Sequence, residues 1–201
     1  MLSKTAEKFL TAARPGARRR LLLKVRQTLE RGKRESQAEL QAMNVLNDSA
    51  ACLEAAIARM RRWKLTPAHR ASISKGLERT YRRGRKAFAL ACEKPTDENL
   101  HEWRKQVKYL GQSLKVWKAL RGTDGEGLIE RADKLADLLG TDHDLVVFEK
   151  RLEMLDAPHP TRPAIALDIA DQRRDLVKKA LKKGRRIFNA KPRVFTRKIA
   201  P

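Results

Sequence analysis

The fold is decided by the stretch from Leu100 to Trp117, which reads LHEWRKQVKYLGQSLKVW. Its apolar residues recur every three or four positions, the spacing of one face of an α-helix. This face holds Trp103, Val107, Leu110, Leu114 and Trp117. The opposite face holds His101, Arg104, Lys105, Lys108, Gln112 and Lys115, with no carboxylate among them. The stretch therefore predicts an amphipathic helix with a buried apolar side and a cationic outer side.

Helix signals continue in both directions, and no segment alternates apolar and polar residues for long enough to predict a strand. Thr66-Pro67 and Pro95-Thr96 each place a capping signal at a helix start. The expected helices cover about 17–43, 47–63, 66–93, 96–121, two shorter segments separated by a break at 139–142, and 164–189, and Pro192 begins a short tail. The chain is therefore predicted to be all-α and built from antiparallel helical bundles.

The charge balance is strongly basic. The 201 residues include 46 Lys and Arg against 24 Asp and Glu, a net charge of +22, which favours polyanionic partners without choosing among them. No apolar run approaches the ~18 residues that a membrane span requires. Residues 1–4 lack the apolar stretch of a signal peptide, so we expect a cytoplasmic protein without membrane association.

Two further helices repeat the division into an apolar and a cationic side. The apolar residues are Leu77, Tyr81, Gly84, Phe88 and Ala91 in the first of these, and Ile169, Leu176, Ala180 and Ile187 in the second. The cationic residues are Arg79, Arg82, Arg83 and Lys86, and Arg174, Lys178, Lys182 and Arg185. If the helices pack side by side, the three faces form a wide cationic groove, in which Arg and Lys are both suited to binding phosphate.

The sequence gives little support for a catalytic site or a metal site. The histidines stand singly without metal spacing, no phosphate-binding loop or nucleophile motif occurs, and we expect no enzyme activity, cofactor or metal. Asp142-His143-Asp144 is interpreted as part of a helix-capping turn, with Asp137 and Asp144 as alternative ion-pair partners for basic side chains. The three tryptophans, Trp63, Trp103 and Trp117, are interpreted as core residues.

Four segments resemble the CHAD family, the conserved histidine α-helical domains. The stretch from Leu100 to Leu110 is similar to its HxxRKxxK signature, and Leu138 to Leu145 is similar to its LLG…D turn. Tyr81 to Ala87 resembles the helix before the signature, and Lys183 to Phe195 resembles the C-terminal end. The resemblance covers about residues 66–199.

The resemblance implies two four-helix bundles that bind inorganic polyphosphate through basic surfaces, including the signature histidine, without catalysis. It assigns residues 66–201 to a second repeat and residues 1–65 to a degenerate or truncated first repeat. Residues 42–50 resemble the L..D turn of a first repeat, with Asp48 in the place of Asp144, but no HxxRK motif precedes them. We thus expect one complete four-helix bundle packed with a partial one. An incomplete first bundle would expose apolar surface, which a homodimer would cover.

The leading hypothesis is therefore non-catalytic polyphosphate binding, with targeting to polyphosphate granules. The binding residues would be His101, Arg104, Lys105 and Lys108 together with the eight cations on the two flanking helices, and binding should tighten as falling pH protonates histidine. The alternative is an RNA- or DNA-binding protein that uses the same basic surface, and a third option is an enzyme acting on polyphosphate.

Overall fold

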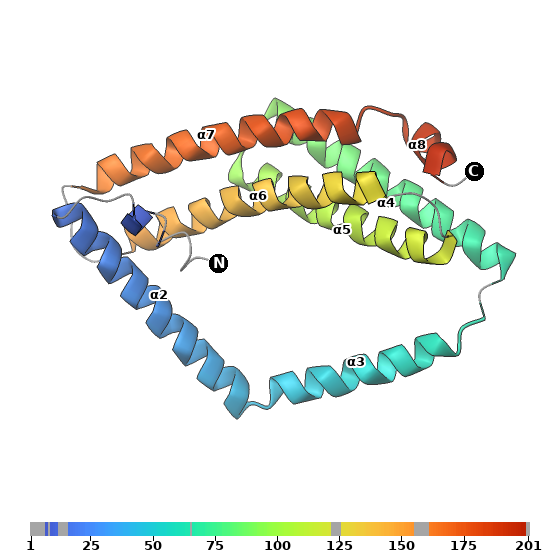
Figure 1. Ribbon diagram of the computed structural model, residues 1–201, viewed down its shortest axis with the longest axis horizontal. Coiled ribbons are helices and arrows are strands. Elements are labelled where there is room, and N and C mark those ends of the chain that lie inside the picture. The colour runs from blue at the N-terminus through green and yellow to red at the C-terminus, as the bar shows by residue number, and fades with distance from the viewer. Residues whose placement is uncertain are drawn as a thin grey trace.

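The structure is a computed structural model that describes residues 7, 9–11, 16–64, 66–121, 126–154 and 161–199. Within these ranges the regular structure is entirely α-helical, as predicted (Figure 1). The helices are α2 (Ala17–Ala42), α3 (Val45–Arg61), α4 (Pro67–Glu93), α5 (Asp97–Arg121), α6 (Glu126–Glu153), α7 (Arg162–Ile187) and α8 (Pro192–Ile199).

Helices α4 to α7 form one four-helix bundle, in which each helix packs against the next along the chain. The apolar stripe predicted on α5 is its centre, because Trp103 and Leu110 are fully buried there. Tyr81 of α4 stacks on Phe195 of α8 with ring centroids 3.7 Å apart. Its hydroxyl donates to the carbonyl oxygens of Ile187 and Ala190, at 3.0 and 3.1 Å. The short helix α8 is thereby fixed against α4 at the end of the bundle.

Two glycines permit the close approach of α4 to the C-terminal part of α7. A Cβ atom on Gly184 would lie 2.5 Å from the ring of Trp103 and 2.7 Å from that of Phe88. A Cβ atom on Gly84 would lie 2.7 Å from the ring of Phe188. Any larger residue at these positions would force the helices and rings apart.

A second, smaller core joins the N-terminal region to the bundle. Leu22 and Val25 of α2 pack with Phe148 of α6 and with Ile165 and Ile169 of α7. Phe9 stacks on Phe148 with ring centroids 5.4 Å apart. The predicted arrangement, a complete four-helix bundle packed with a partial one, is confirmed.

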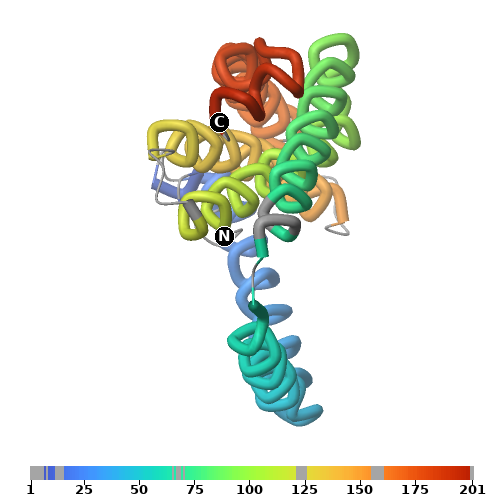
Figure 2. The backbone as a smooth tube through the Cα atoms, turned by 90° about the vertical axis from the view of Figure 1, so that its right-hand side faces the viewer, coloured from blue at the N-terminus to red at the C-terminus, as the bar shows by residue number. Residues whose placement is uncertain are grey.

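Beyond this core, α2 and α3 extend away from the bundle and return to it at α4 (Figures 1 and 2). Asn44 turns the chain between them with φ of 53°, a left-handed conformation that asparagine tolerates better than most residues. Helix α3 buries none of its 17 residues.

Three expectations about local structure are wrong. No break occurs at 139–142, because α6 is continuous and the hydroxyl of Thr141 donates to the carbonyl of Asp137 within it. Trp63 is 67% exposed, whereas Trp103 and Trp117 are buried as expected. The segment after Pro192 forms α8 rather than a tail. The sequence also predicts a linker at Pro158, Pro160 and Pro163 before the last long helix. Pro158 and Pro160 lie outside the described residues, whereas Pro163 lies in the first turn of α7. The division between residues 65 and 66 into two repeats stays a prediction.

Candidate polyanion-binding surface

The cations predicted on α4 and α7 are all exposed. Arg82 pairs with Glu78 at 2.6 Å, and Arg174 pairs with Asp171 at 2.9 Å. The other six have no ion pair with any residue that the structure describes: Arg79, Arg83, Lys86, Lys178, Lys182 and Arg185. These two helices therefore present positive charge that the described part of the protein leaves uncompensated.

A groove of about 750 Å³ lies between α4 and the turn from α7 to α8. Its basic lining comes from Arg82, Arg85 and Lys86, and its apolar lining includes Phe88 and Phe188. The two glycine contacts described above fix the same aromatic rings, so the close approach of the helices also shapes this groove. Cys92 also lines the groove, and burial raises the pKa of its thiol. The positive charge of Arg185 opposes this increase.

The signature helix α5 differs from the expected cationic face free of carboxylates. Lys105 forms an ion pair with Glu102 at 2.8 Å, and Lys115 forms one with Asp133 of α6 at 3.0 Å. Hydrogen bonds from Lys105 and Gln106 lower the pKa of Glu102. Lys108 remains exposed and has no ion pair among the described residues. The prediction missed Glu102 because this residue belongs to neither of the two faces assigned to the helix. It missed Asp133 because this residue lies on a neighbouring helix.

His101 and Arg104 turn towards α6 and are only partly exposed. The ring centroid of His101 lies 4.7 Å from that of His143 on α6. The guanidinium of Arg104 lies over Gly140, with Nε 3.5 Å from the position that a Cβ atom would take there. The signature residues thus form a cluster with α6, which we call the histidine cluster: His101, Arg104 and His143.

His143 is the residue of this cluster that the sequence reasoning did not assign to the site. Burial lowers its pKa, and the positive charges of His101 and Arg104 lower it further. Asp144 and Asp142 act in the opposite direction but do not reverse the shift. The free protein therefore favours the neutral form of His143, and an anion placed beside it would favour the charged form.

Asp142 does not lie in the expected capping turn but within α6, where it forms an ion pair with Arg173. It is 3% exposed and accepts a hydrogen bond from Arg173 Nε of α7 at 2.9 Å, while Arg173 Nη2 donates to Asp97 of α5 at 2.5 Å. Burial raises the pKa of Asp142, and the contact with Arg173 opposes this increase. The three side chains join α5, α6 and α7 next to the histidine cluster. No described ion pair involves Asp137 or Asp144, the partners suggested earlier.

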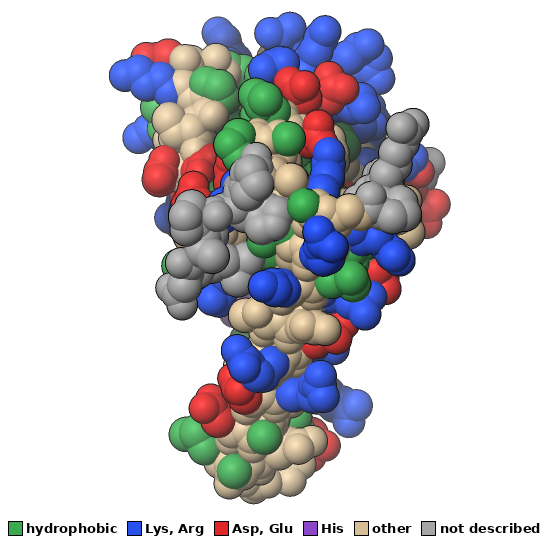
Figure 3. Space-filling model, turned by 90° about the vertical axis from the view of Figure 1, so that its left-hand side faces the viewer, with side chains coloured by type: hydrophobic (Ala, Val, Ile, Leu, Met, Phe, Trp, Pro, Cys, Tyr) green, Lys and Arg blue, Asp and Glu red, His purple; other side chains and the backbone are tan. Residues whose placement is uncertain are grey.

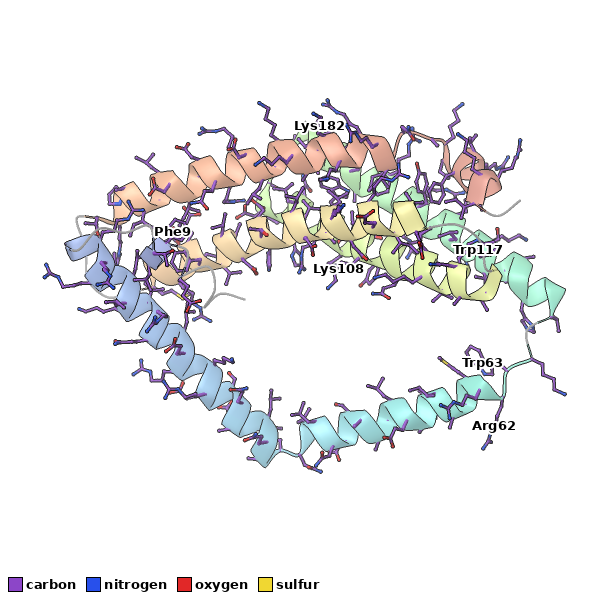
Figure 4. All side chains as sticks on the ribbon, viewed as in Figure 1. Phe9, Arg62, Trp63, Lys108, Trp117 and Lys182 are labelled. Atoms are coloured by element: carbon purple, nitrogen blue, oxygen red, sulfur yellow. The ribbon has the colours of Figure 1, made fainter. Side chains whose placement is uncertain are left out.

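The cations do not form the single groove that the sequence suggested. In Figure 4, Lys182 lies on the outer side of α7, whereas Lys108 lies below α6, towards the opposite side of the bundle. Basic side chains also gather around the upper part of the molecule in the space-filling view (Figure 3). The candidate surface therefore has two parts, the rows on α4 and α7 and the signature face on α5.

Among the residues that the structure describes, no group of three His, Cys, Asp or Glu side chains is placed to hold a metal ion. None of the described helices is both long and apolar enough to cross a membrane.

Comparison with protein-family models gives one match, to the CHAD domain, over residues 2–153. The match includes the signature helix, the glycine under Arg104 and the whole of α2 and α3. It reaches further towards the N-terminus than the resemblance over residues 66–199, and it ends before α7, so the C-terminal segment from Lys183 to Phe195 lies outside it. Searches of curated proteins and of solved structures give no match.

Proposed function

This chain belongs to the CHAD domain family, and we propose that it binds inorganic polyphosphate without catalysing its turnover. The observation that carries the proposal is the set of six exposed cations on α4 and α7 without ion pairs among the described residues. Like charges spaced three or four residues apart destabilise a helix, so a bound polyanion would relieve their repulsion.

The proposed mechanism is electrostatic. Lys and Arg side chains replace the counterions that surround a dense linear polyanion, and release of these ions into solution drives binding. Arginine can hold a phosphate through two parallel hydrogen bonds, whereas lysine acts as a compact charge that accepts many approach angles. Affinity should therefore fall steeply as salt concentration rises.

The separation of the two cationic parts favours a flexible polymer. A polyphosphate chain can bend around the end of the bundle and contact both the α4 and α7 rows and the signature face. Duplex DNA has a persistence length of about 50 nm, so it would contact one part at a time. Recruitment to polyphosphate granules would follow from the same binding, and a fluorescent fusion of the protein would test it in cells.

The test pairs one charge-reversal variant with a matched control. Arg83→Glu with Lys86→Glu removes two unpaired cations from α4, and Arg19→Glu with Arg20→Glu makes the same charge change on exposed residues of α2. We expect the first variant to weaken binding of long polyphosphate and to reduce the slope of log affinity against log salt by about 1 to 2. Equal losses in both variants would mean that only net charge matters and would contradict a site on α4 and α7.

One observation favours RNA as a second candidate ligand. Tyr109 of α5 is 55% exposed next to Lys105 and Lys108, and aromatic rings beside cations stack on the bases of single strands. Competition of long polyphosphate with single-stranded RNA and duplex DNA at physiological salt would decide between them. Tyr109→Ala should weaken RNA binding and leave polyphosphate binding unchanged. Release of phosphate during the assay would support the enzymatic alternative instead.

A further inference from the structure

The part of the chain from residue 30 to residue 63 has no buried residue, although the structure describes all of it. We call this segment the arm; it comprises the C-terminal half of α2, the turn at Asn44, and α3. Seven large apolar side chains are exposed on it: Leu40, Met43, Leu46, Leu53, Ile57, Met60 and Trp63. Exposed apolar residues on this scale mark an interaction surface rather than ordinary surface composition.

The apolar residues of α3 follow a coiled-coil spacing. Leu46, Ala50, Leu53, Ile57 and Met60 are separated alternately by four and three residues. These positions form a continuous seam along one side of a helix, of the kind that inserts side chains between those of a facing helix. Ala55 lies on the opposite side, next to Glu54.

Nothing within the described chain covers this seam. Helices α2 and α3 meet at the turn around Asn44 and diverge from there, so they do not bury each other (Figure 1). A 17-residue helix without tertiary packing has marginal stability in water. The helix therefore requires a partner surface to be well populated.

We propose that the partner is the arm of a second copy of this chain, with α3 packed against its two-fold equivalent and the ends of the two α2 helices beside them. A two-fold pairing presents the same residues from both copies, so the seam needs only to be complementary to itself. Two copies would bring together four helices, which is the number that a helical bundle needs to enclose a core. The family match from residue 2 includes the whole arm, so the arm belongs to the domain.

The absence of net charge on α3 favours a second copy of this chain as the partner. Within Val45–Arg61, Asp48 and Glu54 balance Arg59 and Arg61, so α3 is neutral in a chain of charge +22. Two copies can thus meet at α3 without repulsion. Their basic bundles stay apart, because the arm projects from the bundle (Figure 2). A membrane surface is a poorer fit, since α3 lacks the rich Lys and Arg face of interfacial helices.

The experiment measures the mass of the full-length protein by sedimentation equilibrium, without polyphosphate, from about 1 to 200 μM, a range that spans typical self-association. We expect a monomer–dimer equilibrium. Leu53→Glu should raise the dimer dissociation constant by about 100-fold or more, because each dimer would bury two carboxylates. Ala55→Glu places the same charge on the outer side of α3, within reach of Arg59, and should change the constant little. Since Leu53 is 63% exposed, its replacement leaves the core of the single chain intact.

Hydrogen exchange gives a second measurement on the same samples. Protection of α3 amides should rise with protein concentration in the wild type and in Ala55→Glu, but not in Leu53→Glu. A wild-type monomer throughout the range would overturn the proposal, and so would a dimer that tolerates Leu53→Glu. Protection of α3 at every concentration in a monomer would show instead that the arm folds onto its own bundle. Loss of polyphosphate binding would not alter these masses, so the two proposals fail separately.

Discussion

His143 links the charge around the signature to the stability of the fold. Its pKa is lowered in the folded protein by burial and by the charges of His101 and Arg104. The unfolded chain therefore binds a proton at this residue more readily than the folded chain does. Stability from this group is complete above the ordinary histidine pKa of about 6.5 and is lost as pH falls towards the lowered value.

We expect His143→Gln to reduce the loss of stability between pH 7 and pH 5. The measurement is the difference between the denaturant unfolding curves of the wild type and the variant at several pH values. Parallel pH profiles for the two proteins would contradict the assignment. His69→Gln is the control, because the side chain of His69 accepts a hydrogen bond from the backbone N–H of Thr66 at the start of α4, and glutamine can accept the same bond.

Polyphosphate should reverse the shift at His143. An anion beside the histidine cluster offsets the repulsion from Arg104, so the pKa of His143 rises on binding and the complex takes up a proton. Calorimetric titration at pH 6.5 in two buffers of different ionisation enthalpy should detect this uptake. It should shrink in His143→Gln and persist in His69→Gln. Proton uptake that is equal in all three proteins would place the polymer away from the cluster.

At the level of single residues, the sequence predicted which side chains are exposed better than it predicted which side chains contact each other. The cations on α4 and α7 were placed on the outside because helical periodicity determines which side of a helix is apolar. Periodicity on one helix carries no information about the neighbouring helix, so the contact of His143 with His101 was missed. Gly140 was interpreted as a helix break, but it lies within α6, where its missing side chain leaves room for Arg104.

The connection of α5, α6 and α7 depends on Arg173. It binds Asp142 and Asp97, and Asp142 is almost fully buried. Arg173→Met should lower the free energy of unfolding at pH 7 by about 3 kcal/mol, since it leaves a buried carboxylate without its partner. Burial raises the pKa of Asp142, and without Arg173 nothing from that side chain opposes the increase, so the loss should shrink as pH falls, beginning above the ordinary aspartate pKa of about 3.9.

Arg174→Met is the matched control for this prediction, because the neighbouring arginine pairs with Asp171 at an exposed position. Exposed pairs of this kind contribute little. Chemical unfolding of both variants at pH 7 and pH 4 gives the comparison. A loss in Arg173→Met that does not depend on pH would mean that packing, rather than charge, accounts for it.

The close approach of α4 and α7 depends on Gly184. Gly184→Ala should destabilise the bundle by about 1 to 3 kcal/mol, because the new methyl group would overlap the rings of Trp103 and Phe88. It should also weaken polyphosphate binding by moving the two cationic rows. Gly76→Ala is the control: a Cβ atom there meets nothing within 4 Å, so the alanine should stabilise α4 by about 0.5 to 1 kcal/mol. Thermal unfolding distinguishes the two, and similar melting temperatures would refute the role of Gly184.

The helices themselves were largely predictable, because proline, glycine and capping residues mark their ends. The start of α4 at Pro67 and the buried stripe of α5 agree with expectation. Helix α8 was not expected, since eight residues give too short a pattern for periodicity; its place depends on the long-range contact between Phe195 and Tyr81.

Across the whole molecule, the candidate binding cations lie on two sides of the bundle, with Lys182 on the outer side of α7 and Lys108 towards the opposite side (Figure 4). A flexible polyphosphate can contact both sides, whereas a stiff duplex with the same number of phosphates contacts one. Polyphosphate should therefore show a steeper dependence of log affinity on log salt than the duplex, by at least about one unit. Fluorescence anisotropy at several salt concentrations measures both slopes. Equal slopes would mean that both ligands use the same single face.

The arrangement of the two sides could not be read from the sequence. Each cationic row was identified on its own helix, but the relative placement of the helices follows from the glycine contacts and from the core around Trp103. The expectation of one shared groove assumed that all outward faces point the same way, which a four-helix bundle does not permit, because each of its helices points a different side to the solvent.

The arm also determines what happens when a protease cleaves the chain within it. Both of its ends are anchored, α2 through Leu22 and Val25 in the second core and α4 in the main bundle. A protease that cleaves between Arg61 and Arg62 would break the backbone without separating the pieces. The N-terminal fragment would stay attached through Phe148, Ile165 and Ile169. The protein is thus a natural candidate for reconstitution from two separately produced fragments that find each other through apolar packing.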